Sequence, residues 1–324
     1  MWLKPLTGMV PTALALAAAL VIPASAQVSA PGALPADPDA TLVEELVVVA
    51  RDPGPAWWRV SDADTTVYVL GTPSLAPKRM QWDRTAFERR LKGANEVILP
   101  FQDVRVSVPG FLGATVSLMR LRSSQSYEDT LAGAPRARFV ALRERLGQPA
   151  KRYKTKNPLA VGLLLAEDYR EHEQLTTTDP TKLVKLLARQ AKVPIRQKSY
   201  DLGPLMGKII KTSRPAGEAC LEAVMSQAEA GPGGTRAAAR AWAAGDVVGA
   251  LDAERTYERC FAVVPGAAEF DARIKADQAA AIAQALKTPG HAVALVQLRP
   301  LLSQGGVLDR LRSQGYTIRT PGEE

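Results

Sequence analysis

The sequence is poor in the side chains that most often bind transition metals. It contains two cysteines, Cys220 and Cys260, and two histidines, His172 and His291, among 324 residues. Neither cysteine belongs to a C-x-x-C motif or a Cys/His cluster, so both are poor candidates for metal ligands. Asp168 and His172 are helical i, i+4 neighbours that could share a metal, although a charged, exposed helix end is the favoured interpretation. His291 is predicted to be an ordinary surface or core histidine.

Long hydrophobic runs are also scarce, and the clearest one lies at the N-terminus. Residues 1–26 have the pattern of a secretory signal peptide, with Lys4 before an apolar stretch over 12–22 and an Ala24-Ser25-Ala26 cleavage site. An uncleaved membrane anchor is the weaker alternative, because the stretch is short for a bilayer span of about 20 residues. The pattern predicts a periplasmic or secreted protein.

Export bears on the two cysteines. In an oxidising compartment Cys220 and Cys260 are candidates for one disulfide, and two separate buried thiols are the alternative. A bridge would join the two ends of an Ala-rich stretch, residues 203–266, that is predicted to be a helical insertion. Closing a loop of that length stabilises a fold by roughly 3–4 kcal/mol in the entropic description.

Charge of one sign is only modestly in excess, with a formal net charge of +8. Its densest part is residues 136–156, where Glu144 is the only acidic side chain. Such a run could rest on an anionic surface, but a solvated helix face is favoured. Export and the lack of interleaved aromatics argue against nucleic acid. The partner stays open, with a protein or a cell-envelope component as the options.

Residues 27–56 are predicted to be a proline-rich linker that contains one short strand-like segment, residues 43–50. This segment could add a strand to a partner's sheet edge, which would suit an envelope-assembly factor. A simple N-terminal edge strand is the plainer interpretation.

From residue 57 the pattern predicts one globular domain, residues 57–324. Strands are expected at 58–60, 65–70, 96–99, 193–197, 291–298 and 316–319, and helices at 83–92, 127–146, 159–174, 271–286 and 307–313. The fold class is therefore α/β (α+β): a central mixed sheet built from N-terminal and C-terminal strands, flanked by helices, with the mostly helical insertion.

One strand points to a site. The apolar run from Thr66 stops at Gly71, which allows the backbone a positive φ where it leaves the sheet. In open α/β sheets, ligands bind beyond the carboxyl ends of strands. The pocket candidates are Gly71, Thr72, Ser74, Asp103 and Arg299. The chain has no Gly-x-Ser-x-Gly motif, so the hydroxyls of Thr72 and Ser74 are predicted to satisfy backbone groups in a turn.

This pattern resembles the opening of the TraB/GumN family, which is related to the Tiki-type proteases and carries a strand ending in Gly-Thr-x-His. Near the C-terminus, Gly306-Val307-Leu308 and Gly315-Tyr316-Thr317-Ile318 are similar to the family's last helix and strand. The resemblance implies a metal site of two histidines and a glutamate. Those three positions fall on Ser74, Pro300 and Pro100.

Serine is a weak neutral metal ligand and proline offers no side-chain ligand, so the resemblance implies a degenerate metallohydrolase that acts as a binding or interaction module. No cofactor is predicted. The alternative is a metal-dependent peptidase in which Asp64, Asp103 or His172 supplies substitute ligands for a divalent metal. Asp62 and Asp83 are further carboxylates near strand ends.

Overall fold

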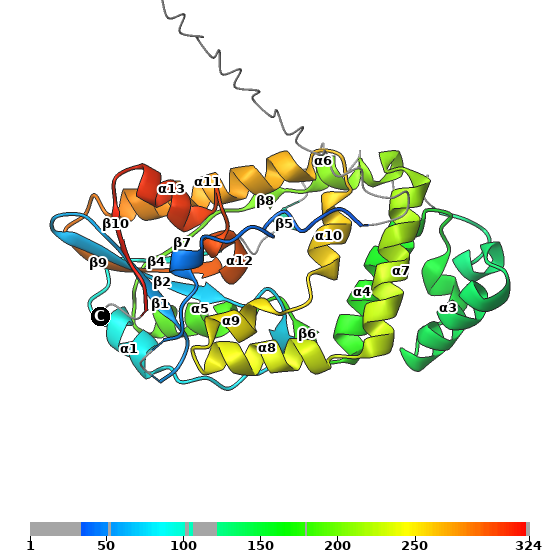
Figure 1. Ribbon diagram of the computed structural model, residues 1–324, viewed down its shortest axis with the longest axis horizontal. Coiled ribbons are helices and arrows are strands. Elements are labelled where there is room, and N and C mark those ends of the chain that lie inside the picture. Colours follow the sequence, from blue (N-terminus) through cyan, green and yellow to red (C-terminus); the bar gives the residue numbers. More distant parts are fainter. Residues whose placement is uncertain (1–33, 51–52, 101–103, 106–121, 179, 322–324) are drawn as a thin grey trace, which may run out of the picture. The chain divides into compact units, whose positions relative to one another are not determined.

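The structure is a computed structural model that describes residues 34–50, 53–100, 104–105, 122–178 and 180–321 (Figure 1). The predicted signal peptide and its cleavage site lie outside the described residues, as do Asp103 and Asp179.

A six-stranded mixed sheet forms the centre of the fold (Figure 1). Its order is β10-β1-β2-β9-β4-β7. The strands are β1 (Trp57–Ser61), β2 (Thr65–Thr72), β4 (Val97–Leu99), β7 (Ile195–Gln197), β9 (Gly290–Gln297) and β10 (Thr317–Arg319). β1 pairs antiparallel with β2 and β10, whereas β2, β9, β4 and β7 run parallel. The predicted class, a mixed sheet of N-terminal and C-terminal strands flanked by helices, is confirmed.

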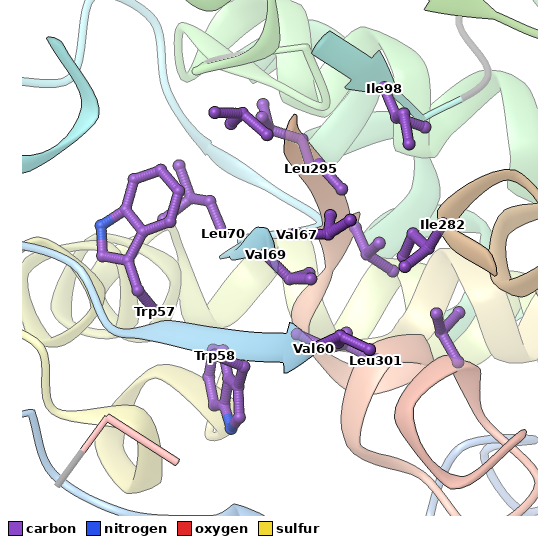
Figure 2. Close-up of a cluster of buried hydrophobic side chains, with 14 of the residues drawn as sticks. Trp57, Trp58, Val60, Val67, Val69, Leu70, Ile98, Ile282, Leu295 and Leu301 are labelled. Carbon is purple, nitrogen blue, oxygen red and sulfur yellow. The ribbon is translucent and has the colours of Figure 1, made fainter. Parts of the chain in front are cut away.

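Both faces are buried along most of β9 and the second half of β2, which explains the apolar runs in these two strands. Helices α1 (Thr85–Leu91) and α5 (Thr181–Gln190) pack on one face, where Trp57, Leu70 and Leu295 lie. Helices α11 (Ala267–Ala285), α12 (Leu298–Leu302) and α13 (Val307–Ser313) cover the other. Figure 2 shows Val60 and Val67 among Ile282 and Leu301 on that second face.

A second hydrophobic cluster forms between helices in the middle of the chain. The elements around it are η2 (Tyr127–Thr130), α3 (Gly133–Arg145), η3 (Ala150–Tyr153), α4 (Pro158–His172), α6 (Gly203–Met206), η4 (Ile209–Lys211), α7 (Arg214–Ala230) and α10 (Thr256–Ala262). Helices α8 (Gly233–Ala243) and α9 (Val247–Leu251) contribute to the cluster of the sheet region instead. The predicted disulfide is present: Cys220 on α7 and Cys260 on α10 are bonded, with their Cα atoms 5.2 Å apart.

Two short strand pairs complete the secondary structure. They are β3 (Ala76–Pro77) with β6 (Leu175–Thr176), and β5 (Val104–Arg105) with β8 (Tyr200–Asp201). The helix predicted over 127–146 is divided into η2 and α3, because Leu131 and Ala132 between them have extended backbone.

The N-terminal segment differs from the strand-like linker predicted for it. Residues 43–50 contain a short 3-10 helix, η1 (Glu44–Leu46), and Leu46 is fully buried in the core of the sheet region. The carbonyl of Leu46 accepts a hydrogen bond of 3.1 Å from the Trp58 indole nitrogen. Isolated bridges pair Leu42 with Ser303 and Val49 with Asp246. The segment therefore pairs with its own domain, because its apolar residues gain more from burial than from an extended edge.

Candidate functional site at the carboxyl edge of the sheet

The carboxyl ends of β2, β9 and β4 lie side by side at one edge of the sheet. Thr72 is paired with Gln297, and Ile98 with Ala294, so the three parallel strands end at nearly the same level. Ser74, Pro300 and Pro100 follow the ends of these strands within three residues. The topology thus places the three positions singled out by the family resemblance at a common edge, as expected for a site in an open α/β sheet.

Gly71 does not have the positive φ that its place before the loop suggested. It remains within β2, paired with Val296, and the strand ends one residue later. The glycine is required by packing instead: a Cβ atom there would lie 2.5 Å from Leu298 Cδ1 and 2.9 Å from Trp58 Cζ3. The sequence did not indicate this role, because local sequence cannot show how closely another element approaches the backbone.

Helix α8 closes this part of the edge. The indole nitrogen of Trp242 donates a hydrogen bond of 2.5 Å to the carbonyl oxygen of Gly71, and Trp242 is itself buried. Thr72 is 2% exposed, and its hydroxyl donates to the carbonyl of Val296 at 3.4 Å. Gly71 and Thr72 therefore pack as structural residues, and the Thr72 hydroxyl satisfies a backbone group as predicted.

Ser74 borders a small cavity whose other polar residues were not singled out from the sequence. The cavity measures about 30 Å³, and Tyr169, Glu254 and Glu258 are among the residues that line it. Burial raises the pKa of Tyr169 to about 12, and its buried hydroxyl has no hydrogen-bond partner in the described part of the chain. This volume is about that of one water molecule. No local motif indicates these residues, because Tyr169 lies in α4, Glu254 in the connection between α9 and α10, and Glu258 in α10.

Arg299, the remaining pocket candidate within the described residues, supports the packing of the N-terminal segment. Its Nη2 donates to the carbonyl of Leu251 at 2.6 Å, and its Nη1 to the carbonyl of Asp39 at 3.4 Å. These two hydrogen bonds connect α12 to α9 and to the N-terminal segment, residues 34–50.

Within the described residues, the substitute metal ligands Asp64 and His172 lie in different parts of the fold, the β1–β2 turn and α4. Asp64 precedes β2, at the end of the strand opposite Ser74, and it accepts a hydrogen bond of 3.1 Å from the hydroxyl of Thr65. His172 is exposed at the last residue of α4. Asp62 accepts from the N–H of Thr65 at 3.0 Å within the β1–β2 turn.

Asp83 has a local role as well, because it accepts a hydrogen bond of 2.8 Å from the Thr85 N–H at the start of α1. That backbone hydrogen bond lowers the pKa of Asp83. Across the residues that the structure describes, no group of three or more His, Cys, Asp or Glu side chains is arranged to hold a metal ion.

Asp168 is not available to share a metal with His172. Its side chain is buried, at 2% exposure. It accepts a hydrogen bond of 2.7 Å from the Tyr153 hydroxyl and one of 2.9 Å from Arg152 Nη2. Burial, and then the hydrogen bond to Asp168, raise the pKa of Tyr153 well above its ordinary value. Asp168 and His172 are spaced i, i+4 on α4 as predicted, but the carboxylate of Asp168 is already hydrogen-bonded to Arg152 and Tyr153.

Half of the eight basic side chains in the run over residues 136–156 are paired with carboxylates. Four of its arginines form ion pairs: Arg136 with Asp129, Arg138 with Glu222 and Glu229, Arg143 with Glu128, and Arg152 with Asp168. This pairing agrees with the solvated-face interpretation and reduces the charge that the run could offer to an anionic surface.

Comparison with known protein families gives the identity of the fold. A model of the TraB/PrgY/gumN family matches residues 56–320, which is most of the chain, and the protein belongs to this family. Comparisons with curated proteins and with solved structures each give no match. Among the described residues, no helix has the length and apolar character needed to cross a membrane.

Proposed function

We propose that this chain is an exported, catalytically inactive member of the TraB/PrgY/gumN family that works by binding another molecule. The observation that carries the proposal is the chemistry of the shared strand edge. The positions that follow β2, β9 and β4 hold Ser74, Pro300 and Pro100, and two of these three side chains have no atom that could bind a metal.

The packing at this edge supports the same proposal. The indole nitrogen of Trp242 donates a hydrogen bond to the carbonyl oxygen of Gly71, and Thr72 is buried. The cavity beside Ser74 has the volume of about one water molecule. A hydrolase needs space at this edge for a substrate carbonyl and for an activated water. Beside Gly71, Thr72 and Ser74, side chains of the protein itself leave little such space.

Metal binding tests the loss of catalysis directly. Purified protein is titrated with Mn²⁺, Co²⁺ and Zn²⁺, and the bound metal is measured after removal of the excess. We expect no stoichiometric binding. Stoichiometric binding that disappears in Asp103→Ala or His172→Ala, but persists in the control variant Asp252→Ala, would show that substitute ligands exist and would refute the proposal.

Export is tested separately, because it is independent of the chemistry of the strand edge. The proposal predicts that the mature chain begins at Gln27, after the Ala24-Ser25-Ala26 site. N-terminal sequencing of protein recovered from cell fractions measures this. Recovery of the uncleaved chain in the cytoplasmic fraction would contradict export and leave the metal-binding result unaffected.

A further inference from the structure

A second, larger pocket lies at the opposite end of β2 and β9 from the strand edge described above. It has a volume of about 530 Å³. Its lining residues are Arg59, Thr66, Tyr68, Arg89, Arg90, Gly290 and His291. Thr66 and His291 are paired in register near the starts of their strands. The volume falls within the range of roughly 300–1,000 Å³ that is usual for small-molecule sites.

The lining of this pocket is cationic. Arg59 comes from β1, Arg89 and Arg90 come from α1, and none of the seven lining residues carries a carboxylate. Arg319 of β10 is paired directly opposite Arg59, which brings a further positive charge to the same side of the sheet. Like charges on paired strand positions destabilise a sheet. A bound anion would offset this repulsion.

The aromatic residues hold one of these arginines in place. Arg90 is 8% exposed, and its guanidinium carbon lies 4.5 Å from the ring centroid of Trp57 and 5.0 Å from that of Tyr68. The Nε2 of His291 is 2.9 Å from the carbonyl oxygen of Arg90, which links α1 to the start of β9. A guanidinium that is already ordered loses little entropy when it binds a ligand.

Arg59 supplies a donor that the protein does not satisfy. Its guanidinium carbon lies 5.9 Å from the ring centroid of Tyr68, and its Nε is buried without a hydrogen-bond partner in the described part of the chain. Leaving a buried charged donor without an acceptor is costly. The oxygen of an anion in the pocket would accept from it.

We propose that this pocket binds a phosphoryl group, carried either by a small soluble molecule or by a lipid headgroup. Guanidinium groups match the geometry of phosphate oxygens through paired hydrogen bonds, and the hydroxyl of Thr66 adds a neutral donor. A doubly charged phosphoryl group neutralises a cluster of arginines better than a single carboxylate does. The site shares no residue with the strand edge, so it does not depend on whether that edge has activity.

Binding of pyrophosphate to the full chain, measured by calorimetry at constant ionic strength, tests the proposal. We expect saturable binding that weakens about tenfold or more in Arg89→Gln, since a charge-assisted hydrogen bond is lost. Arg89 is exposed, so this variant is expected to fold. Arg84→Gln removes the same charge just before α1 and does not line the pocket, so its affinity should match that of the unaltered protein.

Further arms identify the source of the phosphoryl group and test the site itself. Binding to phosphatidylcholine vesicles is measured with and without phosphatidic acid, which distinguishes a lipid headgroup from a soluble ligand. Binding of pyrophosphate or of the vesicles that contain phosphatidic acid, weakened by Arg89→Gln, supports the site. Thr66→Asp, which places a carboxylate in the lining, should abolish binding of both probes. Absence of binding to both probes, equal affinity for citrate, or equal losses in Arg84→Gln and Arg89→Gln would overturn the proposal.

Discussion

Arg255 and Asp39 form a buried ion pair that ties the N-terminal segment to the domain, with Arg255 Nη2 2.9 Å from Asp39 Oδ2. Lys275 Nζ lies 2.5 Å from Asp39 Oδ1, and the Ser303 hydroxyl donates to the same oxygen at 2.9 Å. Asp39 is 1% exposed, so its charge is stabilised almost entirely by these partners. The stretch predicted to be a linker thus has one of the most buried charges in the described structure.

Replacing Asp39 should destabilise the fold strongly. Asp39→Ala leaves Arg255 and Lys275 buried with one fewer counter-charge, and we expect a loss of about 3–5 kcal/mol in the free energy of unfolding. Urea unfolding measures this loss. Asp252→Ala, at an exposed position three residues before Arg255, should change the free energy of unfolding by less than about 0.5 kcal/mol. Equal effects of the two substitutions would contradict the role assigned to the network.

Asp37 should make stability depend on pH in the acid range. Burial alone would raise its pKa, but the hydrogen bond and the charge of Arg255 outweigh burial, so the pKa of Asp37 is lowered. A lowered pKa in the folded state means that the carboxylate adds stability above its unfolded pKa of about 3.9, and that this contribution is lost as the pH falls through the folded value.

The difference in unfolding free energy between the unaltered protein and Asp37→Asn should therefore be largest above about pH 5 and shrink toward about pH 3. Chemical unfolding of both proteins across this pH range measures it. A difference that stays constant or grows on acidification would show that the ion pair with Arg255 does not set the pKa of Asp37.

Gly71→Ala tests the close packing at the carboxyl edge. The added Cβ would meet Leu298 Cδ1 at 2.5 Å and Trp58 Cζ3 at 2.9 Å, and Trp58 cannot move freely because its indole nitrogen is bonded to the Leu46 carbonyl. We expect a loss of about 1–3 kcal/mol in the free energy of unfolding.

The matched control for this substitution is Gly234→Ala. Gly234 lies in α8, and a Cβ there would meet nothing within 4 Å. Because alanine is a better helix former than glycine, stability should stay unchanged or rise by up to about 1 kcal/mol. A loss in Gly234→Ala as large as that in Gly71→Ala would argue against the packing explanation.

The disulfide should add stability because it closes a sequence separation of 40 residues between α7 and α10. Reduction is expected to lower the free energy of unfolding by about 3–4 kcal/mol. Denaturant unfolding with and without a thiol reductant measures this change. The double variant Cys220→Ala/Cys260→Ala serves as the control and should show no response to the reductant. A similar response in both proteins would assign the effect to something other than the bond.

Local sequence patterns determined much of the fold. The alternation and β-branching around residues 57–72 indicated the β1–β2 hairpin, and the predicted turn over residues 288–290 leads into β9. The pattern before Gly315 indicated α13 with its observed bounds. The cysteine count, together with predicted export, indicated the Cys220–Cys260 bridge. These features follow from periodicity and turn chemistry, which neighbouring residues carry by themselves.

Only the tertiary structure decided which polar groups meet. The sequence offered Gly71 as a turn and residues 43–50 as a strand. The close approach of Leu298 and Trp58 to Gly71 and the burial of Leu46 determine what these segments do. The cationic pocket joins Arg59, Arg89 and His291, which are far apart in the chain and adjacent only through strand register and the packing of α1. Periodicity reports which face of an element is buried, whereas the partners across that face are set by the whole fold.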